Sequence, residues 1–301
     1  MKHKLIGKIY SGEDLTWCSQ ETLSELKVGF CQTCGFYHAD PYPDRDFLSR
    51  YYNGYEIPCP LHQEERDRIA RIIGARISPS LPVIDIGCGK GEMLSTLRAH
   101  GFTNLYGTEA GSMRLHASKL KAITMLPYDI EELIRWSNKE AKFFDCALLI
   151  NVLEHVPEPV SLMRQMKDIL SPGGMVMFSI PNDFNVLQNV YLKKTQKKPW
   201  FLVLPDHLNY ISLESIDGVM ERAGYEIIHK TVQYPLELFL LQGDNYTNEP
   251  ETGKICHLKR VEFERSFAVT DSIADLDNLY EVFAKAGIGR DMYILARPIR
   301  E

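Results

Sequence analysis

The sequence predicts an α/β fold in which helices cover both faces of a mainly parallel, seven-stranded sheet. Short apolar segments alternate with helical patterns, and this alternation is typical of βαβ units with right-handed crossovers. A glycine-rich turn joins the first of these strands to a helix, as in open sheets that bind a nucleotide-like ligand. The predicted strands span residues 83–86, 104–109, 122–127, 143–150, 175–180, 225–232 and 289–297.

Helical periodicity fills the intervals between these strands. Residues 64–77 place isoleucines on one face and charges on the other, which predicts an amphipathic helix before the first strand. Further apolar stripes predict helices at residues 92–100, at 113–120, around Leu133 and Trp136, at 162–170, at 213–220 and at 272–286. Strands and helices at this spacing favour a parallel sheet.

The turn after the first strand limits the choice of ligand. The strand ends near an acid, Asp85, and three glycines follow at alternate positions: Gly87, Gly89 and Gly91. A dinucleotide fingerprint would need a glycine where Glu92 stands, and a P-loop would need serine or threonine after Lys90. The glycines still let a ligand approach the backbone closely.

This acid-x-Gly-x-Gly-x-Gly pattern resembles motif I of the class I S-adenosylmethionine-dependent methyltransferases. The segments that follow are similar to this family in the same order, over roughly residues 64–230. The similarity is to the branch with ubiquinone-biosynthesis O-methyltransferases and many sugar and natural-product methyltransferases. It implies a Rossmann-like methyltransferase fold and S-adenosylmethionine as the cofactor.

The resemblance implies a set of cofactor-binding residues. An acid in the first turn suits the charged amino acid end and sulfonium of the cofactor, and a carboxylate after the second strand can accept hydrogen bonds from ribose hydroxyls. An aspartate after the third strand is placed at the adenine, and an asparagine after the fourth faces the methyl donor. The set comprises Asp85, Gly87, Gly89, Gly91, Glu109, Asp129, Ile130 and Asn151.

Two histidines are candidates for acid–base chemistry. Methyl transfer mainly requires positioning of the reactants, and a hydroxyl acceptor also benefits from a base that titrates near neutrality. We expect His207 to be that base and His155, beside Glu154, to orient the cofactor or the substrate. A hydrogen-bonded structural role remains open for each. Glu154 and His155 could also join a divalent-metal site, but no third ligand is identified, so we predict no metal ligand.

The resemblance favours an enzyme that methylates a small hydroxylated metabolite, most simply at an oxygen of a sugar or a natural-product intermediate. Methylation of carbon or nitrogen, aminopropyl transfer from the decarboxylated cofactor and a non-catalytic cofactor-binding module remain as alternatives. An Asn-Pro-Pro-Tyr-type motif, the mark of amino methylation on adenine or glutamine, is absent. Its absence favours small-molecule acceptors over nucleic acid.

Composition points to a soluble cytoplasmic protein. The 301 residues carry a net charge of −6, which gives no electrostatic argument for nucleic-acid binding. No apolar run approaches the length of a membrane span, and residues 1–10 lack the apolar core of a signal peptide. Seven cysteines, an odd number, argue against a disulfide framework and favour a reducing compartment.

The sequence divides into four parts. Residues 1–60 are an amino-terminal extension, and residues 61–232 are the cofactor-binding catalytic core with a lid segment at 184–206. Residues 233–288 are an insertion that could cover the substrate or form a homodimer surface, and 289–301 hold the closing, antiparallel strand. A lysine cluster in the lid favours an anionic acceptor; it comprises Lys193, Lys194, Lys197 and Lys198.

The extension contains a Cys-x-x-Cys pair, Cys31 and Cys34, that resembles the latter half of the small zinc ribbon of some relatives. A structural zinc needs four thiolate or imidazole ligands. Cys59 with His62, or else Cys18, could complete the set, but the usual earlier Cys-x-x-Cys pair is missing. We therefore favour a degenerate ribbon, with zinc as the less favoured alternative.

Overall fold

A computed structural model describes residues 3–17, 25–53, 62–109, 120 and 122–299. The chain forms two compact units, which we treat in turn. The first unit comprises Met1–Tyr42, Ile180–Val219 and Lys230–Tyr293, and the second comprises Pro43–Ser179, Met220–His229 and Ile294–Glu301.

A seven-stranded sheet forms the core of the second unit, and three of its strands also include residues of the first. Its order is β12-β13-β9-β8-β5-β6-β7. The strands are β5 (Val83–Ile86), β6 (Leu105–Thr108), β7 (Thr124–Leu126), β8 (Phe144–Ile150), β9 (Leu170–Pro181), β12 (Tyr225–Val232) and β13 (Asp291–Pro298). All seven coincide with apolar segments that the sequence predicted as strands. The predicted fold class is confirmed.

The central strands are parallel, in agreement with their continuous apolar sequences. β5 pairs with β6 and with β8, and β8 pairs with β9, in each case in parallel. All four residues of β5 are buried, and β8 is buried from Cys146 to Leu149. Strands covered on both faces lose the alternation of apolar and polar residues and become continuous apolar runs.

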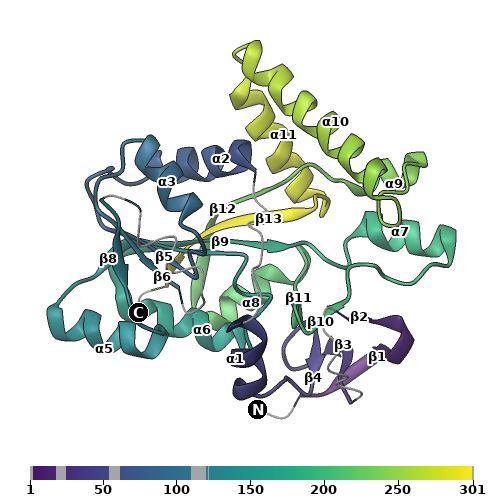
Figure 1. Cartoon of the computed structure of the whole chain (residues 1–301), viewed down its shortest axis with the longest axis horizontal. Coiled ribbons are helices and arrows are strands. Elements are labelled where there is room, and N and C mark those ends of the chain that lie inside the picture. Colours follow the sequence, from purple (N-terminus) through teal and green to yellow (C-terminus); the bar gives the residue numbers. More distant parts are fainter. Residues whose placement is uncertain (1–2, 18–24, 54–61, 110–119, 121, 300–301) are drawn as a thin grey trace. The chain divides into compact units, whose positions relative to one another are not determined.

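Helices cover both faces of this sheet. Figure 1 shows α2 and α3 on one face and α5 and α6 on the other, which is the doubly wound arrangement. The helices of this region are α1 (Arg45–Asn53), α2 (Gln63–Gly74), α3 (Glu92–Ala99), α5 (Ile130–Glu140), α6 (Pro159–Met166), the 3₁₀ turn η2 (Lys167–Ile169) and α8 (Ile216–Ala223). The helix predicted at 113–120 lies outside the described residues, apart from Leu120.

The first unit contains a four-stranded sheet built mainly from the amino-terminal extension. Its order is β1-β3-β4-β11, and neighbouring strands pair in antiparallel fashion. The strands are β1 (Leu5–Ser11), β3 (Lys27–Cys31), β4 (Phe36–Asp40) and β11 (Asn209–Tyr210). The turn η1 (Gly12–Asp14) follows β1, and β2 (Thr16–Trp17) pairs in parallel with β10 (Val203–Leu204).

Four helices complete the first unit: α7 (Val186–Thr195), α9 (Glu237–Gln242), α10 (Pro250–Val269) and α11 (Ile273–Lys285). Helix α11 confirms the amphipathic helix predicted at 272–286 and packs against α10. The apolar pattern of the sequence does not predict α10. This helix buries few residues, among them Arg260 and Glu264, so its apolar stripe is weak. Its burial depends on an ion pair of 3.2 Å between those two side chains.

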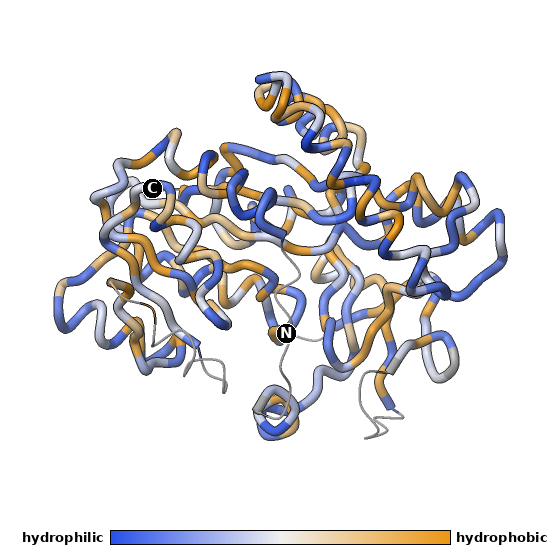
Figure 2. Tube along the Cα trace, turned by 45° about the horizontal axis from the view of Figure 1, so that its top comes forward, coloured by the Kyte–Doolittle hydropathy of each residue, from blue (hydrophilic) through white to orange (hydrophobic). Residues whose placement is uncertain are grey.

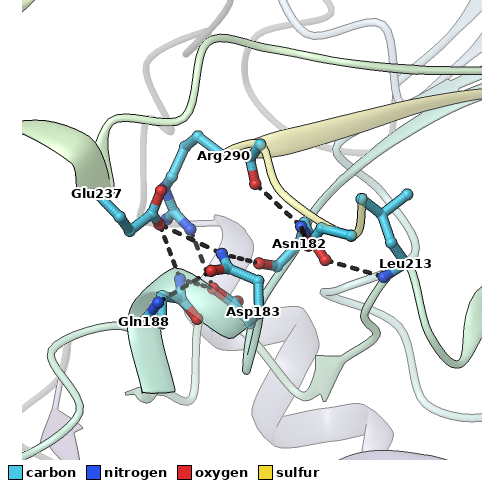
Figure 3. Close-up of polar contacts among 9 residues, drawn as sticks. Asn182, Asp183, Gln188, Leu213, Glu237 and Arg290 are labelled. Carbon is cyan, nitrogen blue, oxygen red and sulfur yellow. Dashed lines mark hydrogen bonds and ion pairs between the residues drawn. The ribbon is translucent and has the colours of Figure 1, made fainter. Parts of the chain in front are cut away.

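A polar cluster with two buried carboxyl groups links α7, α9 and the start of β13 (Figure 3). The Arg290 guanidinium donates to an Asp183 carboxylate oxygen at 3.0 Å. The Gln188 side-chain amide donates to Asp183 at 3.2 Å and to Glu237 at 3.1 Å. Burial raises the pKa of Asp183 and of Glu237, while Arg290 and Gln188 oppose the rise. Arg290 and the side-chain amides of Gln188 and Asn185 therefore hold two buried carboxyl groups in place.

The hydropathy of the chain follows this architecture. In Figure 2 hydrophobic and hydrophilic stretches alternate along the described chain, on helices as well as elsewhere. Among the residues that the structure describes, no helix is both long enough and apolar enough to cross a membrane.

Candidate functional site

The predicted glycine turn lies at the carboxyl end of β5 in the second unit. Its three glycines all adopt the left-handed conformation, with φ of 71° at Gly87, 54° at Gly89 and 81° at Gly91. A Cβ atom on Gly87 would also lie 3.1 Å from the Val152 side chain. Only glycine adopts such a run of conformations without strain, and the resulting turn exposes backbone amides at the start of α3.

Glu109 reaches back from the end of β6 to this turn. Its carboxylate accepts a hydrogen bond of 2.8 Å from the Gly89 amide. The backbone amides of Gly87 and Cys88 meanwhile donate to the Thr108 carbonyl at 2.9 and 3.0 Å. The end of β6 therefore fixes the shape of the turn and places a carboxylate beside it.

Asp85 is buried at the end of β5, with only 2% of its surface exposed. One of its carboxyl oxygens, Oδ1, has no hydrogen-bond partner among the described residues. Burial, together with the nearby Glu109 carboxylate, raises the pKa of Asp85 to about 8. Burial also raises the pKa values of the adjacent Cys88 and Cys146 thiols, so these groups stay neutral. A cation that approached Asp85 would stabilise its charged form.

Asn151 lies just after β8 and adopts a left-handed conformation with φ of 52°. The hydroxyl of Ser179, on β9, donates to the Asn151 side-chain oxygen at 2.6 Å. The backbone amide of Asn151 in turn donates to the Ser179 hydroxyl oxygen at 3.1 Å. A non-glycine residue in this conformation costs free energy, and the two hydrogen bonds offset that cost.

Asp129 and Ile130 begin α5 after β7. The Asp129 carboxylate caps this helix by accepting from the Glu132 amide at 2.8 Å, and Glu132 bonds back to the Asp129 amide. Arg45 forms an exposed ion pair with Asp129 at 3.5 Å. The capping box accounts for Asp129 and Glu132 at this helix start without a ligand. No described contact joins Asp129 or Ile130 to the glycine turn.

Glu154 and His155 follow β8 in the second unit. The Glu154 side chain is buried, and its Oε1 lies 3.9 Å from His155 Nε2. The Tyr52 hydroxyl donates to the His155 carbonyl at 3.5 Å, and the Tyr52 ring lies edge-on to the imidazole. The histidine is thus half-buried between an acid and an aromatic ring.

His207 belongs to the first unit, between β10 and β11. Its Nε2 lies 3.8 Å from an Asp206 carboxylate oxygen. Its backbone amide donates to the Val203 carbonyl at 2.8 Å, and the Tyr210 hydroxyl donates to the His207 carbonyl at 2.9 Å. The backbone of His207 is therefore fixed, and its imidazole lies beside an acid.

The structure joins two of the predicted cofactor residues directly, Gly89 and Glu109, and Asp85 is near enough for the Glu109 charge to raise its pKa. It adds Ser179, which the sequence pattern did not identify and which holds Asn151. A signal was present, because Ser179 is the single polar residue within the apolar strand 175–180. A hydroxyl buried in such a strand needs a partner, and here the partner is a residue at the end of the neighbouring strand.

Comparison with known families gives a match over the same region. A family model described as a methyltransferase domain matches residues 61–230, which is more than half of the chain. This range contains every predicted site residue.

Curated relatives share part of this region. The ubiquinone biosynthesis O-methyltransferase of Vibrio vulnificus strain YJ016 is 28% identical over 141 residues, covering 46% of this chain and 60% of the relative. The protein of the same name from Neisseria meningitidis serogroup C strain 053442 is 31% identical over 127 residues, covering 41% and 51%. The matched region thus spans between half and 60% of the length of these relatives.

Solved structures include an S-adenosylmethionine-dependent methyltransferase from Archaeoglobus fulgidus. It is 16% identical to this chain, with a TM-score of 0.48, and the alignment covers 84% of this chain and 99% of that protein.

Proposed function

Because the chain belongs to the methyltransferase-domain family, a family of S-adenosylmethionine-dependent enzymes, we propose that it methylates a small hydroxylated metabolite. The preferred acceptor atom is an oxygen of a sugar or a natural-product intermediate. The observation that carries the proposal is the turn after β5. Three left-handed glycines there lie beside the Glu109 carboxylate and the buried Asp85.

The residues around this turn fit S-adenosylmethionine. Asp85 offers a buried carboxyl oxygen that has no hydrogen-bond partner among the described residues, and a positively charged ligand would favour its ionised form. Glu109 offers a carboxylate that can accept from two ribose hydroxyls. When bound, the cofactor supplies a methyl group on a positively charged sulfur. The absence of phosphate from this ligand agrees with a turn that lacks the serine or threonine that a P-loop needs after Lys90.

We assign the proton chemistry to the chain's own histidines. His207 would accept the proton of the acceptor hydroxyl as the new oxygen–carbon bond forms, with Asp206 stabilising the resulting imidazolium. His155, held between Glu154 and Tyr52, would orient the acceptor. The assignment of His207 is supported by its position 3.8 Å from an acid and by its anchored backbone.

We further propose that the acceptor carries a negative charge. Lys193 and Lys194 lie in the last turn of α7, within the predicted lid. The Lys197 ammonium contacts the Tyr191 hydroxyl at 3.2 Å, so it is held near the same end of the helix. Positive charge gathered on one short segment attracts phosphate or carboxylate groups, and the attraction weakens as salt increases.

Calorimetry with S-adenosylhomocysteine tests the cofactor assignment. We expect Glu109→Ala to bind the ligand about 10- to 150-fold more weakly, because it loses hydrogen bonds to a charged group worth about 1.5–3 kcal/mol. Asp85→Ala should also weaken binding. Glu140→Ala, which changes an acid at the far end of α5, is the matched control. Unaltered tight binding in both site variants would refute the assignment.

A second experiment tests the reaction. The wild-type protein is incubated with S-adenosylmethionine and a panel of hydroxyl, amine and carbon acceptors, and products are detected by mass spectrometry. We expect methylated products from hydroxylated acceptors, and a loss of about 10²–10⁴-fold in turnover for His207→Gln with cofactor binding retained. Turnover only with the decarboxylated cofactor would indicate aminopropyl transfer instead. Tight cofactor binding without any turnover would favour a binding module.

A further inference from the structure

Four metal-ligand side chains meet in the first unit, and none of them belongs to the proposed cofactor turn. They are His3, Cys31, Cys34 and His38, and one potential ligand atom from each lies within 4.8 Å of all the others. We propose that these two cysteines and two histidines bind one zinc ion that stabilises the amino-terminal sheet. Two thiolates and two imidazoles are a donor set typical of structural zinc.

The separations between ligand atoms match a tetrahedral site. With a Zn–S bond of about 2.3 Å and a Zn–N bond of about 2.05 Å, a tetrahedral angle places sulfur about 3.6 Å from nitrogen. Nδ1 of His3 lies 3.4 Å from the Cys34 sulfur and 3.8 Å from the Cys31 sulfur. Both distances are close to the value that a shared metal ion requires.

The cysteines lie on a tight turn between β3 and β4 that presents both sulfurs on the same side. The Cys34 amide donates to the Cys31 sulfur at 3.4 Å, and the Gly35 amide donates to the Cys31 carbonyl at 2.7 Å. Gly35 adopts a left-handed conformation with φ of 75°, which lets the chain turn back directly after the second cysteine. An amide hydrogen bond to sulfur stabilises the thiolate that a metal needs.

Cys31 and Cys34 are both available as ligands. The Cys31 side chain is fully buried, and its sulfur lies 3.8 Å from Nδ1 of His3. Neither Cys31 nor Cys34 forms a disulfide. A metal binds the thiolate, so zinc binding would displace the thiol protons.

His38 is oriented as a metal-binding histidine. Its side chain is fully buried on β4, and Nδ1 lies 2.7 Å from the Ala39 carbonyl. A carbonyl can only accept, so Nδ1 carries the proton and Nε2 presents its lone pair. Nε2 has no hydrogen-bond partner among the described residues. A buried nitrogen in this state, on a histidine grouped with two cysteines, is explained by a metal ligand role in which the Ala39 carbonyl holds the other ring nitrogen.

Strand pairing brings His3 to the same place. β1 pairs with β3 so that Leu5 lies opposite Cys31, and the Gln32 amide donates to the Lys4 carbonyl at 3.0 Å. The residue before Lys4 therefore lies beside the cysteine turn. The His3 ring also packs edge-on against His38, with centroids 4.6 Å apart. A metal at this point would join the start of the chain to the β3–β4 hairpin.

The proposed zinc would stabilise more than the hairpin. β4 pairs with β11, with His38 opposite Asn209, and the Ala39 amide donates to the Leu208 carbonyl at 2.8 Å. The Tyr42 hydroxyl donates to the Asn209 side chain at 2.7 Å. Loss of the metal should therefore loosen β4 together with β11 and leave the strands of the seven-stranded sheet unaffected.

Metal analysis of the wild-type chain tests the proposal directly. The full chain, purified without a histidine tag and under reducing conditions, should contain about one zinc per molecule. After removal of zinc with a chelator, added Co²⁺ should give the visible bands of a tetrahedral thiolate complex. Chelation should also speed hydrogen exchange at the amides of Gln32 and Ala39 but leave that of Ile84 on β5 unchanged. Metal-free protein that gives no cobalt spectrum would overturn the proposal.

Variants identify the ligands. Cys34→Ser and His3→Ala should each lose most of the zinc, because a structural site needs four ligands. His3→Cys should retain it, because a thiolate at the same position restores the fourth ligand. Cys256→Ala, which changes a buried cysteine of the same unit outside the cluster, is the matched control and should bind as the wild type does. Zinc content that is equal in Cys34→Ser and in the control would contradict the assigned ligands.

Discussion

Replacing Asp85 with asparagine should make the stability of the cofactor-free protein less sensitive to pH. The Asp85 carboxyl has an ordinary pKa of 3.8, which burial and the Glu109 charge raise to about 8 in the folded protein. Between these values the native state keeps a proton that the unfolded chain has lost. Stability therefore falls as pH rises, by about 1.4 kcal/mol per pH unit, and the accumulated cost at pH 7 is about 4 kcal/mol.

Urea unfolding at pH 5, 6 and 7 measures this effect. We expect the free energy of unfolding of Asp85→Asn, relative to that of the wild type, to rise by about 1.4 kcal/mol per pH unit over this range, because asparagine cannot ionise. Other buried acids, such as Asp183 and Glu237, contribute equally to both proteins and cancel in the difference. Thr96→Val, which changes a buried group that does not titrate, should differ from the wild type by a constant amount. Parallel curves for Asp85→Asn and the wild type would refute the reasoning.

Three further outcomes are expected. Calorimetry at pH 7 in buffers of different ionisation enthalpy should show release of up to about 0.9 proton per S-adenosylmethionine bound, the protonated fraction of Asp85, and none from Asp85→Asn. Ser179→Ala should lose about 1–3 kcal/mol in urea unfolding and weaken cofactor binding, because Asn151 loses two hydrogen bonds; unchanged values would contradict this. Arg290→Met should lose about 3–5 kcal/mol, since two buried carboxyl groups lose their cation, whereas the exposed Arg297→Met should lose less than about 1 kcal/mol; equal losses would exclude this role.

Much of the seven-stranded sheet could be predicted from the sequence. A strand covered on both faces must be apolar along its whole length, so β5 and β8 are legible as short apolar runs. The turn after β5 needs glycine at three left-handed positions, and the sequence has glycine at all three. Both features can be recognised in a few consecutive residues, so the sequence is enough to predict them.

The contacts of the site were harder to predict. Asp129 fits the family motif, yet its carboxylate caps α5. An aspartate at this position therefore suits a helix cap as well as a cofactor contact. Ser179 reaches Asn151 across two strands, and a single polar residue within an apolar run does not identify its partner. Helix α10 has no clear apolar face because it buries the ion pair of Arg260 and Glu264. Hydrophobic periodicity does not reveal such a helix.

The sequence alone therefore determined the strands of the seven-stranded sheet, the glycine turn and the family, because each depends on residues close together in the chain. Only the tertiary structure brought His3 and His38 to Cys31 and Cys34, since the pairing of β1 with β3 and of β3 with β4 decides which distant side chains meet. The sequence pointed to Cys59 with His62, or else to Cys18. Cys18 and Cys59 lie outside the described residues, and His62 precedes α2. Long-range register depends on the whole sheet, and a Cys-x-x-Cys pair cannot specify its other two ligands by spacing alone.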